Sequence, residues 1–195
     1  MPFTIPNCLT FFRIIAIPLI IIAYYSGMAY SNWYATVLFV LAGISDALDG
    51  YLARKWNQTS KLGEFLDPVA DKLLVATMLI LIVSNIDLLN KLMFSGAFSI
   101  AVIIIISREI TVSALREWMA ELGKRANVAV SNIGKFKTGI QMTAIGFLLF
   151  EEDLIGIPVL RFGEFMLYIA AILTVWSMSI YLSAAYKVVK EDIST

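Results

Sequence analysis

Residues 45–71 have the sequence SDALDGYLARKWNQTSKLGEFLDPVAD, in which pairs of aspartates stand on both sides of a short basic connection. Apolar stretches over 33–53 and 68–86 overlap its two ends. A helix of roughly 20 apolar residues crosses the hydrocarbon core of a bilayer. Because so few residues join the two stretches, we expect two antiparallel membrane helices whose aspartates lie at one shared end.

The whole chain is unusually apolar. Of its 195 residues, 59% are hydrophobic and only 15% are charged, which is well outside the range of soluble proteins. Six stretches are suited to crossing a membrane, over 9–25, 33–53, 68–86, 92–111, 133–150 and 162–186. We therefore expect an all-α fold, a polytopic bundle of six transmembrane helices that forms a single domain over residues 1–195.

The basic residues predict how this bundle is oriented. They cluster between the second and third stretches, between the fourth and fifth, and after the sixth. The opposite side has only Lys91 and Arg161, beside Asp87 and the acidic run over 151–153. Because cytoplasmic loops are enriched in Lys and Arg, both termini and the aspartates are expected on the cytoplasmic side.

The composition also excludes several kinds of chemistry. Histidine is absent and Cys8 is the one cysteine, so the chain can form neither a Ser-His or Cys-His pair nor an internal disulfide. The 15 basic and 15 acidic residues cancel, which gives no support to a nucleic-acid-binding surface. Any reaction must therefore depend on carboxylates, hydroxyls, Lys and Arg.

The aspartates indicate a metal site. Asp46 and Asp49 are three residues apart and Asp67 and Asp71 four apart, so each pair lies on one face of its helix. An aspartate at the centre of a membrane helix costs roughly 2.5–3.5 kcal/mol unless it is compensated. Two divalent cations would balance four carboxylates, and oxygen ligands favour Mg²⁺ or Mn²⁺. A pair of such ions can clamp a phosphoryl group.

Small residues accompany the aspartates. Gly43, Gly50 and Ala53 fall on the same helical stripe as Asp46, and Gly63 precedes the second pair. They leave shallow surface on which a nucleotide can approach the backbone. The alternative is close helix packing, which small residues also favour in membranes.

The pattern Asp46-x2-Asp49-Gly50-x2-Ala53-Arg54-x8-Gly63-x3-Asp67-x3-Asp71 resembles the signature of the CDP-alcohol phosphotransferase family. The resemblance implies a six-helix homodimer in which Asp46, Asp49, Asp67 and Asp71 bind two Mg²⁺ or Mn²⁺ ions. It implies that Asp71 also removes the proton of the acceptor hydroxyl. Six residues are predicted to bind CDP-diacylglycerol: Gly50, Arg54, Ser60, Gly63, Asn7 and Thr10. Thr59 is an alternative to Ser60.

Three further stretches are similar to bacterial members of this family that use sn-glycerol 3-phosphate as the acceptor. They are residues 5–13, Arg108-Glu109 with Arg116, and residues 134–138. The resemblance implies transfer of a phosphatidyl group from CDP-diacylglycerol to that acceptor at the bacterial inner membrane, among membrane lipids. The cations predicted to bind the acceptor phosphate are Arg108, Arg116, Lys135 and Lys137. Ordinary enrichment of basic residues on the cytoplasmic side is the alternative for each of them.

Three alternative functions would also use a cluster of aspartates in a membrane protein. The acceptor can instead be inositol phosphate, serine or a phosphatidyl lipid, with the same metal site. An intramembrane prenyltransferase also uses Asp-rich motifs, but it needs two that are far apart in sequence. A divalent-cation transporter would need carboxylates deeper in the membrane, and the fourth to sixth stretches offer none there.

Overall fold

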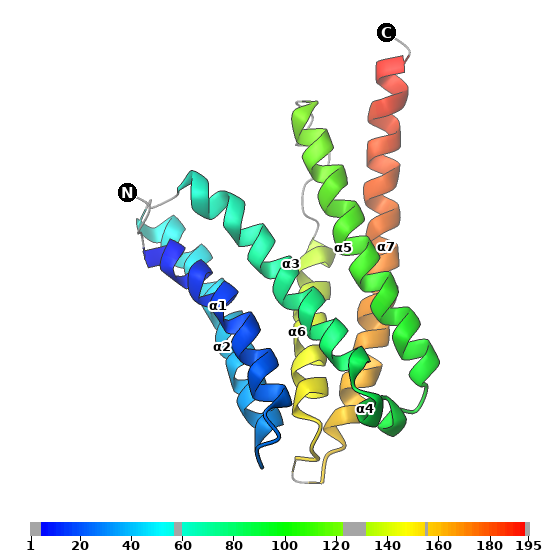
Figure 1. Ribbon diagram of the computed structural model, residues 1–195. Helices are drawn as coiled ribbons and strands as arrows, with labels where there is room; N and C mark the ends of the chain where they lie inside the picture. The colour runs from blue at the N-terminus through cyan, green and yellow to red at the C-terminus, as the bar shows by residue number, and fades with distance from the viewer. Residues whose placement is uncertain (1–4, 57–59, 123–131, 155, 194–195) are drawn as a thin grey trace. The chain divides into compact units, whose positions relative to one another are not determined.

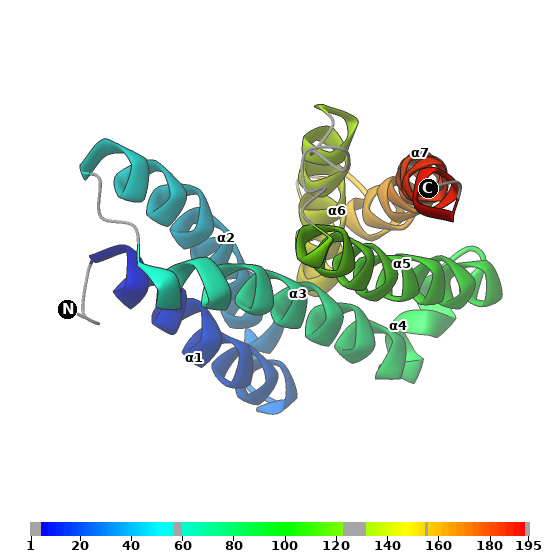
Figure 2. The same ribbon diagram turned by 90° about the horizontal axis from the view of Figure 1, so that it is seen from above.

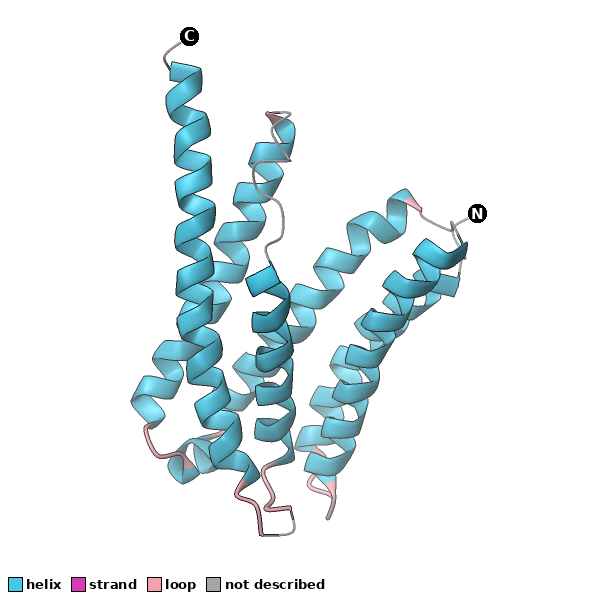
Figure 3. Ribbon diagram, turned by 180° about the vertical axis from the view of Figure 1, so that it is seen from behind, coloured by secondary structure: helices cyan, strands magenta, loops and turns pink. Residues whose placement is uncertain are grey.

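The computed structural model describes residues 5–56, 60–122, 132–154 and 156–193. Seven helices occupy these residues: α1 (Ile5–Tyr25), α2 (Ser31–Trp56), α3 (Lys61–Ser84), α4 (Ile86–Lys91), α5 (Ser95–Glu121), α6 (Asn132–Phe150) and α7 (Val159–Ile193). Figure 1 shows these helices, and Figure 3 distinguishes them from the described loops and turns. The predicted all-α class is confirmed.

Four of the helices are long and apolar enough to cross a membrane. Over the described residues these segments are Pro6–Tyr25, Ser31–Leu52, Ser95–Glu121 and Val159–Ser183. They correspond to the first, second, fourth and sixth predicted stretches. The third and fifth stretches are helical as α3 and α6, but neither meets the same criterion of length and apolar composition.

The chain divides into two compact units. Unit 1 comprises residues 1–92 and 145–163, and unit 2 comprises residues 93–144 and 164–195. That the whole chain forms a single domain stays a prediction.

In unit 1, α1 packs against both α2 and α3, and the views from two directions show these three helices side by side (Figures 1 and 2). Small side chains such as Ala16, Ala42 and Ala70 are fully buried in them. In a membrane the hydrophobic effect does not drive helices together, so their association depends on close packing. Small residues allow this packing because they let helix backbones approach closely. The beginning of α1, the end of α2 and the beginning of α3 lie at one end of unit 1 (Figure 1).

A network of polar contacts lies at the other end of unit 1. Tyr24, in the last turns of α1, donates a hydrogen bond of 2.8 Å to Glu151, which follows α6. Asn85, between α3 and α4, donates to the Tyr24 hydroxyl over 2.6 Å, and Lys91 pairs with Glu151 over 3.2 Å. These contacts agree with the expectation that Lys91 and the acidic run share one side of the membrane.

In unit 2, Glu164 of α7 binds the segment that leads into α5. Its carboxylate accepts hydrogen bonds of 3.0 Å from the backbone N–H groups of Met93 and Phe94, and one of 2.8 Å from the Tyr168 hydroxyl. Glu164 is almost fully buried. The first N–H groups of a helix have no partner within the helix, and the helix dipole favours a negative charge there. Glu164 therefore links the start of α5 to α7.

We expect Glu164→Gln to destabilise the protein by about 1–3 kcal/mol, because an amide group would present a donor where two backbone donors need an acceptor. The apparent thermal midpoint of the purified protein in detergent is the measurement. For a chain of this size, a fall of about 2–4 °C per kcal/mol is expected. Glu152→Gln, the same change at an exposed residue, is the matched control, and an equal midpoint for both variants would contradict the role of Glu164.

Candidate active site

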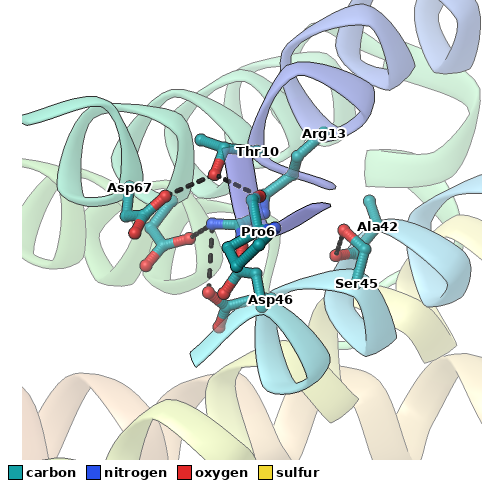
Figure 4. A network of polar contacts seen from close by, with 9 residues as sticks. Pro6, Thr10, Arg13, Ala42, Ser45, Asp46 and Asp67 are labelled. Atoms are coloured by element: carbon teal, nitrogen blue, oxygen red, sulfur yellow. Dashed lines mark hydrogen bonds and ion pairs between the residues drawn. The ribbon is translucent and has the colours of Figure 1, made fainter. Parts of the chain in front are cut away.

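The four predicted aspartates lie on α2 and α3, and α1 supplies their partners. Asp46 and Asp49 belong to α2, and Asp67 and Asp71 to α3. Figure 4 shows Asp46 and Asp67 on either side of the first turns of α1. The aspartates of α2 and α3 are expected to converge, and in the structure α1 lies between them and contacts both pairs.

Arg13 of α1 is at the centre of this carboxylate cluster. Its side chain is 0% exposed, and its guanidinium pairs with Asp46 over 3.0 Å. It also pairs with Asp49 and with Asp71. Asp49 is 4% exposed, whereas Asp46 and Asp71 are 48% and 46% exposed. The cluster is therefore closed around Arg13 and Asp49 but remains accessible from the side of Asp46 and Asp71.

Asp67 has a different partner. The Thr10 hydroxyl donates to Asp67 Oδ1 over 2.5 Å and lies 3.2 Å from the carbonyl oxygen of Pro6 (Figure 4). Thr10 precedes Arg13 by three residues, so both point from one face of α1. All four aspartates are consequently held by α1.

The carboxylate oxygens of this cluster are suitable ligands for divalent cations. Over the described residues, no group of three or more His, Cys, Asp or Glu side chains has the arrangement to hold one metal ion, and the Arg13 guanidinium lies among the carboxylates. One guanidinium balances only one of their four negative charges, however. Every potential ligand atom is a carboxylate oxygen, the type that Mg²⁺ and Mn²⁺ prefer. The cluster fits such ions in charge and in ligand type, and they would compete with Arg13.

A second group of predicted residues meets at the beginning of α3. Ser60 caps the helix by accepting a hydrogen bond of 2.9 Å from the Gly63 N–H, and its hydroxyl donates to Asn7 over 2.9 Å. A Cβ atom at Gly63 would lie 2.7 Å from the Asn7 side-chain oxygen. Gly63 is therefore required for packing against α1. The side chains of Asn7 and Ser60 occupy the space beside Gly63, which favours the alternative of close helix packing at this glycine.

The remaining residues predicted to bind CDP-diacylglycerol are only partly described. Gly50 follows Asp49 on α2 and is half-buried. The side chain of Arg54, also on α2, lies outside the described residues, as does Thr59.

Two of the predicted acceptor cations are buried in unit 2. Lys137 is 2% exposed and its Nζ is 2.5 Å from Glu109 Oε1. Arg108 is 8% exposed, pairs with the same Glu109 oxygen over 3.4 Å and donates to Ser177 over 2.9 Å. Such burial does not fit an ordinary solvated basic loop.

Arg116 lies two helical turns beyond Arg108 on α5. Its guanidinium donates a hydrogen bond of 2.8 Å to the Tyr181 hydroxyl on α7. Arg108 and Arg116 share a face of α5, because both guanidinium groups lie against the Tyr181 ring. The side chain of Lys135 lies outside the described residues.

Sequence reasoning assigned no role to four residues of these two clusters, Arg13, Glu109, Ser177 and Tyr181. Arg13 had a signal, since a charge inside an apolar stretch is costly without a partner. Glu109 stands next to a predicted site residue. Ser177 and Tyr181 had no signal, because a serine and a tyrosine are ordinary in a membrane helix.

Comparison with known proteins supports the expected family. A sequence model of the family described as CDP-alcohol phosphatidyltransferase matches residues 3–176. A protein of Haemophilus influenzae named CDP-diacylglycerol–glycerol-3-phosphate 3-phosphatidyltransferase is 50% identical over 95% of each chain. Proteins of the same name from Shigella flexneri serotype 5b and Escherichia coli K12 are 46% identical over 95% of this chain and 96% of theirs. This chain belongs to the CDP-alcohol phosphatidyltransferase family.

Proposed function

We propose that this chain transfers the phosphatidyl group of CDP-diacylglycerol to sn-glycerol 3-phosphate, giving phosphatidylglycerophosphate and CMP. The observation that carries the proposal is the similarity, over nearly the whole chain, to bacterial proteins whose names state this activity. The carboxylate cluster of unit 1 and the buried cations of unit 2 supply the two kinds of site that the reaction needs.

Asp71 is the proposed base. It accepts the proton of the C1 hydroxyl of the acceptor, whose oxygen attacks the β-phosphorus of CDP-diacylglycerol as CMP leaves. The exposure of its carboxylate, 46%, supports access to a substrate hydroxyl. Two Mg²⁺ or Mn²⁺ ions held by Asp46, Asp49, Asp67 and Asp71 would supply positive charge that stabilises the transferred phosphoryl group and the departing CMP.

Binding of CDP-diacylglycerol is proposed for residues at the same end of unit 1. Arg54 is suited to a diphosphate oxygen because a guanidinium forms charge-assisted hydrogen bonds with phosphate. Gly50 leaves the backbone of α2 accessible beside Asp49. The other proposed residues are Ser60, Gly63, Asn7 and Thr10.

The acceptor phosphate is proposed to bind Arg108, Arg116, Lys135 and Lys137. Among the described side chains of this cluster, Arg108 and Lys137 pair with the same carboxylate, that of Glu109, and Arg116 donates to the Tyr181 hydroxyl. Positive charge therefore exceeds negative charge in a buried place. A phosphate monoester carries close to two negative charges at neutral pH and would balance that excess.

The proposed setting is the bacterial inner membrane. Helices α3 and α6 would join the four long apolar helices to give six spans, with both termini and the active site facing the cytoplasm. The distribution of Lys and Arg between the connections supports this orientation. The family resemblance supports a single membrane domain and a homodimer.

Asp71→Asn is expected to lower CMP release by about 10³-fold or more, since general base catalysis alone contributes about 10²–10⁴-fold. An amide can still contact Arg13, so the fold is expected to persist. CMP release from CDP-diacylglycerol and sn-glycerol 3-phosphate measures the first effect, and the apparent thermal midpoint measures the second.

Asp153→Asn makes the same change at an exposed loop residue and is expected to keep normal turnover. Turnover of Asp71→Asn within a few-fold of this control would remove Asp71 from the reaction.

EDTA is expected to abolish CMP release, and Mg²⁺ or Mn²⁺ to restore it. A measurement independent of turnover uses Arg13→Gln. In this variant three of the four carboxylates lose their guanidinium partner, so Mn²⁺ is expected to raise the apparent thermal midpoint of EDTA-treated protein more than in the unchanged protein. Arg161→Gln, at an exposed arginine, should behave like the unchanged protein. If Mn²⁺ shifts the midpoint of neither Arg13→Gln nor the unchanged protein, the metal proposal fails.

The acceptor is tested with purified protein and labelled CDP-diacylglycerol. CMP release is expected with sn-glycerol 3-phosphate and not with inositol phosphate, serine or a phosphatidyl lipid, because the latter alcohols lack the phosphate or the shape that the buried cations would recognise. Preferential release with one of the other alcohols would keep the family chemistry and overturn the proposed acceptor.

A further inference from the structure

Tyr181 on α7 connects two of the predicted acceptor cations, and nothing in its sequence context marks it. Its ring centroid lies 5.5 Å from the guanidinium carbon of Arg108 and 5.1 Å from that of Arg116. Its hydroxyl accepts the 2.8 Å hydrogen bond from Arg116. One side chain thus makes three contacts with two cations.

The tyrosine ring is itself fixed by packing. Tyr181 is 4% exposed and belongs to a buried cluster with Val112, Met119 and Ala185. Val112 lies midway between Arg108 and Arg116 on α5, four residues from each. The ring therefore packs on the apolar centre of this face of α5, with a guanidinium at each side.

The two arginines retain unused donors. The Nε–H groups of Arg108 and Arg116 are buried and, over the described residues, have no hydrogen-bond partner. A buried donor without a partner is costly, so an acceptor of hydrogen bonds is expected there. A phosphate group offers such acceptors and the negative charge that a guanidinium prefers.

Arginine side chains lose much rotational freedom when they bind a ligand. Holding them in place before binding lowers that entropic cost and raises affinity. Aromatic faces are suited to the task, because a guanidinium stacks on them while its N–H groups remain available at its edges. The guanidinium groups of Arg108 and Arg116 both lie over the Tyr181 ring.

We propose that Tyr181 is a positioning residue that orients Arg108 and Arg116 for the phosphate of the acceptor. This inference rests on the proposed function, because it assigns the acceptor phosphate to these arginines. Tyr181 acts through the arginines without touching the substrate, since its ring is buried and its hydroxyl is already bonded to Arg116. Its loss should therefore weaken acceptor binding and leave the chemical step and the binding of CDP-diacylglycerol unchanged.

The test compares Tyr181→Phe and Tyr181→Leu in the full-length protein in detergent. Phenylalanine keeps the ring and loses the hydroxyl, whereas leucine loses both. We expect KM for sn-glycerol 3-phosphate to rise about 3-fold in the first variant and about 10-fold in the second, with kcat and KM for CDP-diacylglycerol within about 2-fold. Tyr181→Phe retains the packing of the buried cluster, so it tests the proposal even if the leucine variant does not fold.

Tyr168→Phe is the matched control. Tyr168 is also on α7 in unit 2, and its hydroxyl bonds to Glu164 over 2.8 Å and to the carbonyl oxygen of Phe94 over 3.1 Å. It contacts neither arginine, so its removal is expected to affect the thermal midpoint without changing KM for the acceptor. A merely structural role for Tyr181 would give the same result as this control and would overturn the proposal.

A binding measurement separates this inference from the proposed function. Inorganic phosphate and sn-glycerol 3-phosphate are expected to raise the apparent thermal midpoint of the unchanged protein, and to do so less in both Tyr181 variants. One outcome is that the unchanged protein uses another acceptor, while phosphate stabilises the Tyr181 variants less than the unchanged protein. In that case the proposed acceptor fails and the positioning role stands. If turnover with sn-glycerol 3-phosphate is normal and phosphate stabilises all variants equally, the positioning role fails and the proposed function stands.

Discussion

The contact between Arg13 and the aspartates is the interaction on which unit 1 depends. A buried arginine and the three carboxylates that it contacts are each costly in a membrane helix, and their opposite charges compensate one another. Because Arg13 is on α1 while Asp46 and Asp49 are on α2 and Asp71 is on α3, this compensation requires the three helices to meet at one end. The polar groups that serve the chemistry therefore also determine how the helices are assembled.

The two units carry opposite kinds of charge, and each kind fits one part of the proposed reaction. In unit 1 negative charge exceeds positive charge, which favours divalent cations. In unit 2 the described pairs place Arg108 and Lys137 against one carboxylate, that of Glu109, and this excess of positive charge favours a phosphate. Both excesses are buried or half-buried, where electrostatic interactions are weakly screened by water. A donor that contains a diphosphate and an acceptor that contains a phosphate suit such a protein.

Several residues have structural and chemical roles at the same time. Gly63 permits the close approach of Asn7, while Ser60 both caps α3 and bonds to Asn7. Substitutions at such residues would change the position of α1 relative to α3 as well as any contact with a substrate. Tyr181 is comparable in unit 2, where a residue of the buried core also holds two cations.

The amino-acid sequence by itself determined the helical class, the face on which each aspartate pair lies and the family, because helical periodicity, apolar length and fixed spacing are local properties of the chain. Only the tertiary structure decided that Arg13 occupies the carboxylate cluster, that Gly63 is covered by Asn7 and that Tyr181 lies against Arg108 and Arg116. These contacts join residues 33 or more positions apart, and sequence spacing carries no information about which distant side chains meet. The physical reason is that buried charges and donors must find partners across helices, and packing selects which partners those are.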